Sequence, residues 1–408
     1  MAEQVKTIKS SGGDYASLQL WEDDADGEST TTDPWVAECY SGFNLGAVTF
    51  SAFTDPPTQQ SEAVRIYAAS GHEHDGISGG AYIDTTANSQ VSFNFPAGVT
   101  GYFIIDGIRT DGKNSTYTTT KCLYAEDASI EVLNCVFYNF DSQSVHLANI
   151  TNEATGVWIL RNTIVNDSDS HTVNALVNIT SSSFTLTIQN CVLYNGGSAT
   201  QALRAQKSGT NTHICVLENT IMHSTGATTL SFGTMTSKTV NNCATEDSTA
   251  DNYGGTGNIV DQTMTDIFNN PASNNFFLRA GSNAIAAGKD LSGTFTADIV
   301  GATFGATWDM GAYLYHTTPV ISTIKSSGGT YSSLQIWEDA VDGGYFPVQW
   351  AECYSGFSLG PFTKSAWVAE SSAEAERRKV YAAPGHEHDG SWSTSSGAYS
   401  SITSGWNI

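Results

Sequence analysis

The sequence predicts an all-β fold in which short strands stack as successive coils of a parallel solenoid. Three observations support this class: a strand-like pattern recurs, its copies are almost evenly spaced, and small polar residues are far commoner than charged ones. The order in each copy is an apolar residue, any residue, Asn or Asp, a small residue and an apolar residue. The polar positions are Asp106, Asn134, Asn162, Asn190, Asn219 and Asn242. The steps between them are 28, 28, 28, 29 and 23 residues.

A unit of this length cannot enclose a core of its own, so neighbouring units have to stack. Apolar residues alternate with a period of two around each polar position, which indicates strands. Strands in register about 4.8 Å apart would place the polar residues above one another at a bend. Asn and Asp tolerate left-handed backbone there, and stacked amides can hydrogen-bond along the axis. We therefore expect the six residues to form a structural ladder.

Length and charge limit the partners that the chain can have. It has 408 residues, with 17 Lys and Arg against 41 Asp and Glu, and a formal net charge of −24. Such a surface repels nucleic acid and acidic polysaccharide unless cations intervene. No leader-like apolar segment and no membrane-spanning run are visible, so we expect neither export nor membrane insertion.

The seven cysteines fit a stacked core better than disulfides or a metal site. Cys135, Cys191 and Cys243 each follow the Asn of their copy, and no CxxC pair is present. Their odd number and shared position predict small buried thiols. No cofactor is expected.

The first element along the chain is an opening module, residues 1–76. Residues 17–23 fit a short amphipathic helix with Leu18 and Trp21 on one face. Residues 37–43 and 65–69 are typical of strands, and a polar turn follows them. Because an open solenoid end is an unpaired strand edge, we expect this module to be an N-terminal cap.

The remaining elements are the coils, a less regular stretch after them and a second copy of the opening module. Residues 77–245 hold about six coils, and the less regular residues 246–318 close the solenoid. In residues 319–408 the opening module returns: residues 323–331 repeat residues 7–15 at an offset of 316. This second copy is predicted to be a docking or oligomerisation domain.

Several segments together make the chain similar to a known group. The residues 12–15, 71–76, 280–285 and 309–313, with the Asn-centred coils, resemble right-handed parallel β-helix proteins of the pectate-lyase-like and phage tailspike-like kind. The resemblance covers residues 7–316 and implies the fold more than the function, because this fold hosts lyases, hydrolases, adhesins and inert structural proteins. A β-helix made without a leader resembles a bacteriophage virion protein, and such proteins are typically homotrimers on a tail or a capsid.

The histidines of the repeated polar turn raise a metal hypothesis. His72 and His74, with their copies His386 and His388, stand beside carboxylates, and both groups are suitable metal ligands. A third ligand from elsewhere in the chain cannot be named. We therefore interpret the segment as a polar turn that closes the cap, and predict no metal.

The charged residues raise two catalytic hypotheses. Lyase action on uronic acids needs carboxylates that hold Ca²⁺ and a basic residue beside the sugar, but Arg109 and Arg161 fall in different columns of the repeat. A glycosidase needs two carboxylates about 5–9.5 Å apart. Acids in the loops could meet across neighbouring coils, although such acids are usually solvated, so no catalytic residue is predicted. The acids concerned are Glu126, Asp127, Asp141, Asp167 and Asp169.

Two aromatic residues, Tyr138 and Tyr194, occupy the same position in their coils. Stacked tyrosines could hold sugar rings or form an interface between subunits, and the interface is the preferred interpretation.

These observations predict a trimeric β-helix of a phage virion, a capsid decoration (cement) or tailspike-type surface protein that binds rather than catalyses. Its expected partners are its own copies, capsid or tail proteins reached through the C-terminal module, and a host surface glycan. One alternative is a polysaccharide depolymerase or lyase. Another is a self-polymerising filament, in which the C-terminal module of one chain covers the solenoid end of the next.

Overall fold

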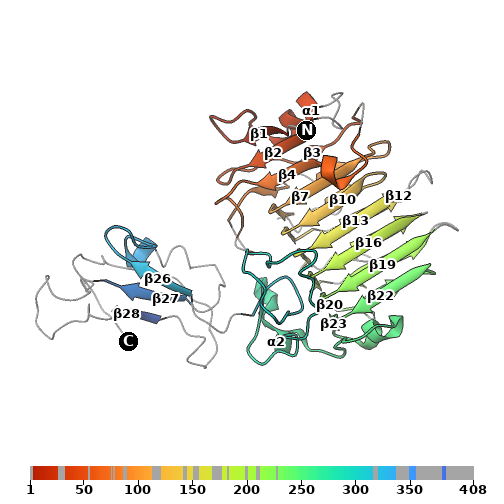
Figure 1. The fold of residues 1–408 in the computed structure, drawn as a ribbon. Helices are drawn as coiled ribbons and strands as arrows, with labels where there is room; N and C mark the ends of the chain where they lie inside the picture. Colours follow the sequence, from red (N-terminus) through yellow and green to blue (C-terminus); the bar gives the residue numbers. More distant parts are fainter. Residues whose placement is uncertain are drawn as a thin grey trace, which may run out of the picture. The chain divides into compact units, whose positions relative to one another are not determined.

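The computed structural model confirms the predicted class: an all-β chain whose strands stack in parallel as a solenoid (Figure 1). The chain divides into two units, Met1–Leu314 and Tyr315–Ile408, which are described separately. The residues that the structure describes are 3–25, 33–53, 56–74, 76, 79–85, 90–112, 121–140, 145–149, 156–167, 177–181, 183–197, 201–207, 212–226, 228–315, 320–336, 349–354 and 379–382.

Three parallel sheets form the walls of the first unit. The first sheet contains, in spatial order, β1 (Gln4–Ile8), β2 (Trp35–Cys39), β4 (Val64–Ala68), β7 (Tyr102–Asp106), β10 (Ser129–Leu133), β13 (Gly156–Arg161), β16 (Phe184–Gln189), β19 (His213–Glu218) and β22 (Ser237–Asn241). The second sheet contains β5 (Tyr82–Asp84), β8 (Arg109–Asp111), β11 (Val136–Tyr138), β14 (Ile164–Asp167), β17 (Val192–Asn195), β20 (Ile221–Ser224) and β23 (Ala244–Thr245). The third contains β3 (Val48–Thr49), β6 (Val91–Phe95), β9 (Lys121–Ala125), β12 (Val145–Asn149), β15 (Val177–Ser181), β18 (Leu203–Lys207) and β21 (Leu230–Phe232).

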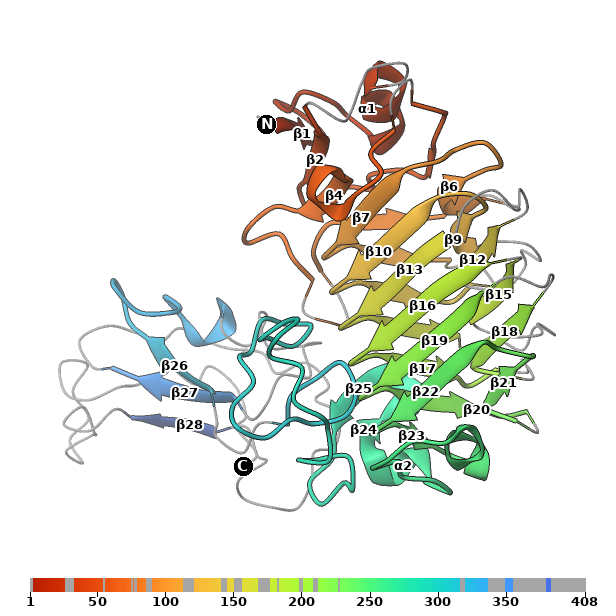
Figure 2. The ribbon, with the colours of Figure 1, turned by 45° about the vertical axis from the view of Figure 1, so that its right-hand side comes forward.

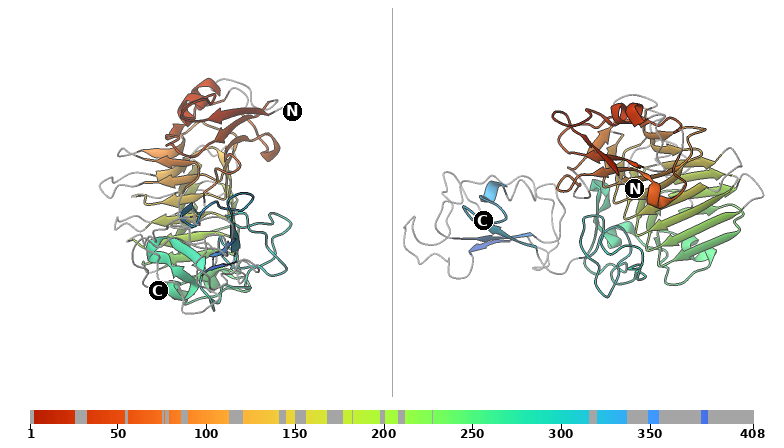
Figure 3. Two further views of the ribbon diagram at one scale, coloured as in Figure 1. Left: turned by 90° about the vertical axis from the view of Figure 1, so that its left-hand side faces the viewer. Right: turned by 45° about the horizontal axis from the view of Figure 1, so that its top comes forward.

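The solenoid has more coils than the six predicted. Nine strands line the first sheet, and three of them, β1, β2 and β4, come from the opening module (Figure 3). The count fell short because it followed the Asn pattern, which these three coils lack. Their strands nevertheless pair in parallel and in register with the rest, Val64 opposite Phe103 and Ile66 opposite Ile105.

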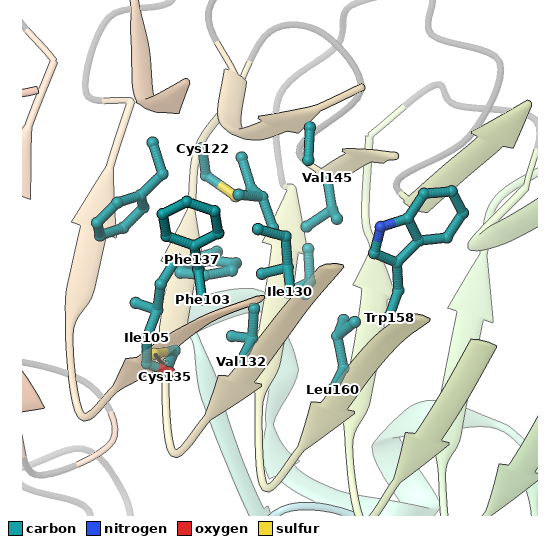
Figure 4. Packing of buried hydrophobic residues seen from close by; sticks show 14 of the residues in the cluster. Phe103, Ile105, Cys122, Ile130, Val132, Cys135, Phe137, Val145, Trp158 and Leu160 are labelled. Carbon is teal, nitrogen blue, oxygen red and sulfur yellow. Dashed lines mark hydrogen bonds between the residues drawn. The ribbon is translucent and has the colours of Figure 1, made fainter. Parts of the chain in front are cut away.

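Side chains alternate between the two faces along each strand of the first sheet. Those that point inward fill the interior of the solenoid with columns of aliphatic residues. One column runs through Ile105, Val132, Leu160, Ile188 and Leu217, all of them almost wholly buried. Figure 4 shows its upper members beside a neighbouring column of larger side chains. Each buried side chain of this size stabilises the fold by about 1.5–3 kcal/mol, so the stacked columns hold the coils together.

Short helices pack at the two ends of the stack. The helix α1 (Leu18–Ala25) buries Leu18 and Trp21 completely, and the Trp21 ring meets Phe50 edge-on at 6.4 Å. This agrees with the amphipathic helix predicted there. At the other end, the 3-10 helix η2 (Ser248–Tyr253) follows β23 and places the Tyr253 ring edge-on to Phe232, with ring centroids 4.7 Å apart.

The last part of the first unit folds back along the outside of the second sheet (Figure 2). We call residues 264–314 the closing segment. It contains α2 (Met264–Ile267), the antiparallel pair β24 (Phe268–Asn270) and β25 (Asn275–Leu278), the 3-10 helix η3 (Pro271–Ser273) between them, and an irregular stretch.

Contacts along the whole second sheet hold the closing segment in place. Asn166 donates to the side chain of Asn274 at 2.6 Å, and the Gly311 amide donates to the Asn219 carbonyl at 2.6 Å. A Cβ at Gly311 would lie 2.7 Å from Ile221, which shows how closely the two layers meet. The outward residues of the second sheet, Val136, Ile164, Val192 and Ile221, are consequently buried.

The second unit repeats the first three strands of the first sheet. Its strands β26 (Val320–Ile324), β27 (Gln349–Cys353) and β28 (Lys379–Ala382) are parallel. The register is also repeated: Ile324 pairs with Cys353 as Ile8 pairs with Cys39. The sequence repeat is therefore a repeat of structure.

Candidate functional site

Asparagine occupies the corner between the first and second sheets in five consecutive coils. Asn134, Asn162, Asn190, Asn219 and Asn242 all have left-handed backbone, with φ between 47° and 57°. This conformation costs other non-glycine L-residues about 1–2 kcal/mol, and Asn tolerates it better because its short amide can hydrogen-bond locally. The recurring pattern in the sequence thus marks a backbone requirement of the coil.

The first member of the expected ladder is displaced by one residue. Gly107, with φ of 70°, takes the corner in that coil, while Asp106 ends β7 and pairs with Leu133. Glycine adopts this backbone without penalty, so the coil needs no Asn. Asp106 still accepts a hydrogen bond from the Asn134 amide at 2.8 Å.

The amide column runs through three asparagines and then turns aside. Asn162 donates to Asn134 at 3.2 Å, and Asn190 donates to Asn162 at 2.9 Å. Asn219 instead pairs with the backbone of Lys289, donating at 2.8 Å and accepting at 2.6 Å. In the absence of this contact with Lys289 of the closing segment, Asn219 would be the partner of Asn190.

The small residue after each Asn has a role of its own. Its hydroxyl or thiol donates back to the carbonyl two residues earlier, at 2.9–3.3 Å. This explains why Cys and Thr alternate at one position, since both are small donors. The residues are Cys135, Thr163, Cys191, Thr220 and Cys243.

All seven cysteines are buried free thiols. Burial raises the pKa of Cys191 and of Cys243 to about 12. A thiol with so high a pKa stays protonated and unreactive.

The two described histidines of the polar turn make separate structural contacts. His74 Nδ1 accepts from the Gly76 amide at 3.0 Å, so Nε2 carries the proton and donates to the Asn134 carbonyl at 2.6 Å. His72 Nδ1 lies 2.7 Å from the Ser41 hydroxyl. Within the described part of the chain, no three potential ligands gather around a metal position. His386 and His388 lie outside the described residues.

The two tyrosines lie on the outward face of the second sheet, where the closing segment packs. Tyr138 is 2% exposed and donates to the Gly76 carbonyl at 2.9 Å. Tyr194 stacks on His223 at 4.5 Å and meets Phe276 of the closing segment at 5.1 Å. No local sequence pattern predicts that the closing segment covers the two tyrosines, because its residues lie far along the chain.

The outward face of the first sheet carries a chain of paired polar side chains. Arg161 donates to Glu131 at 2.6 Å and to Gln189 at 2.9 Å. Gln189 donates to Glu218 at 2.8 Å, and Lys289 pairs with the other oxygen of Glu218. The network spans four neighbouring strands and ties the closing segment to the sheet.

The acids of this face have altered pKa values because they are buried. Desolvation raises the pKa of Glu131, although Arg161 acts in the opposite direction. Desolvation also raises the pKa of Asp106. Glu131 is 0% exposed, with Arg161 on one oxygen and Gln60 on the other. Its described contacts are those of a structural carboxylate.

The other charged residues considered from the sequence are divided among different strands and turns. Arg109 is on β8 of the second sheet, 3.9 Å from Asp111, whereas Arg161 is on β13 of the first. Glu126 accepts from Tyr124, and Asp127 accepts from the Gly98 amide at 2.8 Å. Asp167 is buried at the end of β14. Asp141 and Asp169 lie outside the described residues.

Beside the polar network, β13, β16 and β19 present an uncharged patch that the sequence analysis missed. We call it the aliphatic face; all its residues are partly exposed. The signal for it is that apolar or Thr residues occupy the outward as well as the inward positions of these strands. Its members are Val157, Ile159, Thr185, Thr187, Ile214 and Val216.

None of the helices in the described ranges is long and apolar enough to cross a membrane. Searches among known protein families, curated proteins and solved structures found no significant match to this chain.

Proposed function

We propose that the protein is a structural component of a phage virion, a capsid decoration or tailspike-type surface protein that assembles as a homotrimer and binds rather than catalyses. One observation carries this proposal: no described residue covers an uncharged patch on the first sheet, while the acids Glu131 and Glu218 beside it are paired within the chain. Surfaces of this composition are typical of contacts between proteins.

The state of the acidic groups supports a binding role. Catalytic carboxylates need access to the bond that they protonate or attack. Glu131 is fully buried between Arg161 and Gln60, and Asp106 is bonded by Asn134. Both contribute to the solenoid wall.

The repeated unit supports attachment to a larger assembly. Lys9 lies 3.7 Å above the Tyr40 ring, and its copy Lys325 lies 3.9 Å above Tyr354. Each tyrosine donates to a glutamate at 3.0 Å. The second unit therefore keeps these side-chain contacts of the first as well as its strands, and we assign it the docking role.

Truncation tests this assignment. A chain ending at residue 318 retains the first unit and should fold with the same far-UV circular dichroism per residue. We expect it to be absent from particles produced with it, whereas the full chain is found on them by immunogold labelling. Incorporation of the truncated chain at the normal level would contradict the docking role.

A polysaccharide-degrading enzyme is the second candidate, because two carboxylates of the first sheet, Asp106 and Glu131, lie close enough to interact electrostatically. Incubation with host capsule or lipopolysaccharide separates the two functions. Shortened glycan chains would support the enzyme, and glycans of unchanged length support the binding protein. Negative-stain images distinguish discrete trimers from filaments.

A further inference from the structure

We infer that copies of this chain associate through the aliphatic face on β13, β16 and β19. The inference rests on the proposed function and adds to it a specific surface and a specific partner, a second copy of the chain.

The face is flat and regular because its residues are in register. Val157, Thr185 and Ile214 form one row across the three strands. Ile159, Thr187 and Val216 form the next. No described segment lies in front of these strands in Figure 1 or Figure 2.

The same rows are covered by the chain itself closer to the N-terminal end. There Tyr102 and Ile104 are 8% exposed and cluster with Ala63, which follows the 3-10 helix η1 (Gln60–Glu62). Val157 packs partly against this cluster, so the covered and uncovered parts are continuous. An apolar cover therefore packs on these rows near the N-terminal end. On β13, β16 and β19, no described part of the chain covers them.

Charge identifies a second copy as the occupant. Two chains of net charge −24 repel one another except where their facing surfaces are neutral. The aliphatic face is uncharged, and the acids beside it are already paired, Glu131 with Arg161 and Glu218 with Lys289.

Shape leads to the same occupant. A flat sheet of β-branched residues packs best against another flat sheet, at about 10 Å. A basic partner would gain more by binding the acidic surfaces elsewhere, and the face offers a nucleic acid no cation.

The variant Ile159→Lys tests the inference in the full-length protein. It brings an additional ammonium into the contact, opposite Glu131, whose two oxygens already accept from Arg161 and Gln60, and should weaken association about tenfold or more, as measured by sedimentation velocity over a range of concentrations. The control Ser231→Lys makes the same charge change on β21 of the third sheet and should associate like the wild type. Because both changes lower the net negative charge, general repulsion cannot account for a loss specific to Ile159→Lys.

Cross-linking provides a second test that does not depend on tolerance of a lysine. All native cysteines are buried, so a cysteine introduced as Thr187→Cys is the accessible thiol. A bis-maleimide of about 10 Å, the spacing of packed sheets, should join copies of Thr187→Cys. It should leave the control Ser231→Cys as single chains.

The outcomes separate this inference from the proposed function. Association that is unchanged in Ile159→Lys, with no cross-linking of Thr187→Cys, would overturn the interface and leave an assembling protein. A wild-type chain that stays monomeric at all concentrations would overturn both.

Discussion

The corner asparagines show how one backbone requirement becomes a sequence signature. Each corner needs left-handed backbone, a donor along the axis and room for the next coil, and Asn meets all three. Gly107 meets the first and the third but has no side-chain donor, and there Asp106 supplies the acceptor that ends the column. The structure therefore explains both the repeat and its exception.

Replacing Asn162 by Ala should destabilise the first unit by about 2–4 kcal/mol. The change strains a backbone with φ of 47° and removes the amide that donates to Asn134 and to the Ala297 carbonyl. Asn162→Gly removes the same hydrogen bonds without the strain and should cost about 1–2 kcal/mol. Denaturant unfolding of the two variants measures the difference. Equal losses would show that left-handed strain does not govern the corner.

Asp298 gives the closing segment a dependence on pH. Its carboxylate accepts from the amides of Val300, Ala302 and Leu314 at 2.8–3.0 Å. Burial nevertheless raises its pKa to about 6, from 3.8 in an unfolded chain. The folded state then binds the proton more tightly, so the stability from this group is complete below about pH 4 and is lost as pH rises to about 6.

The variant Asp298→Asn should accordingly lose the fall in unfolding free energy between about pH 4 and 6. The control Asp266→Asn removes a largely exposed carboxylate and should keep the slope of the wild type. Melting temperatures measured across this range decide the matter. Parallel pH profiles for all three proteins would contradict the assignment.

At the scale of elements, the closing segment determines which sheet remains available. It covers the second sheet and its tyrosines, while no segment that the structure describes covers the aliphatic face of the first sheet. Its end is fixed at Gly76, whose carbonyl accepts from both Tyr138 and Tyr313 at 2.8–2.9 Å. A Cβ at Gly76 would overlap the Tyr313 hydroxyl.

Replacing Gly76 by Ala should release the end of the closing segment. Gly98→Ala is the matched control, because Gly98 has nearly the same φ, 87° against 88°, and open space around it. The control should cost about 1 kcal/mol through backbone strain alone. In Gly76→Ala we expect faster amide exchange around Tyr313, with the columns of the first sheet still protected. Equal exchange in both variants would show that Tyr313 does not anchor the segment.

The elements also show what the sequence can and cannot predict. The stacked coils were predictable because each corner repeats a local demand on the backbone, as at Asn134 and Asn162. The helix with Leu18 and Trp21 was predictable from its spacing. The cover over Tyr138 and Tyr194 was not, because it depends on contacts such as Asn166 with Asn274, 108 residues apart. The aliphatic face was missed because a strand apolar on both sides resembles a buried one.

On the scale of the whole molecule, charge and surface shape act together. A net charge of −24 makes copies repel one another over most of their surface, so we expect them to associate only through uncharged surfaces. The aliphatic face is such a surface on the first unit. The second unit repeats the first three strands of the first sheet, and we propose it as the part that attaches to a particle.

A cryo-electron microscopy map of the purified full-length protein tests the central claim most directly. The account predicts copies whose first sheets meet at β13, β16 and β19, with Ile159 and Thr187 buried between them. A map of single chains, or of copies joined through another sheet with Ile159 and Thr187 facing solvent, would contradict it.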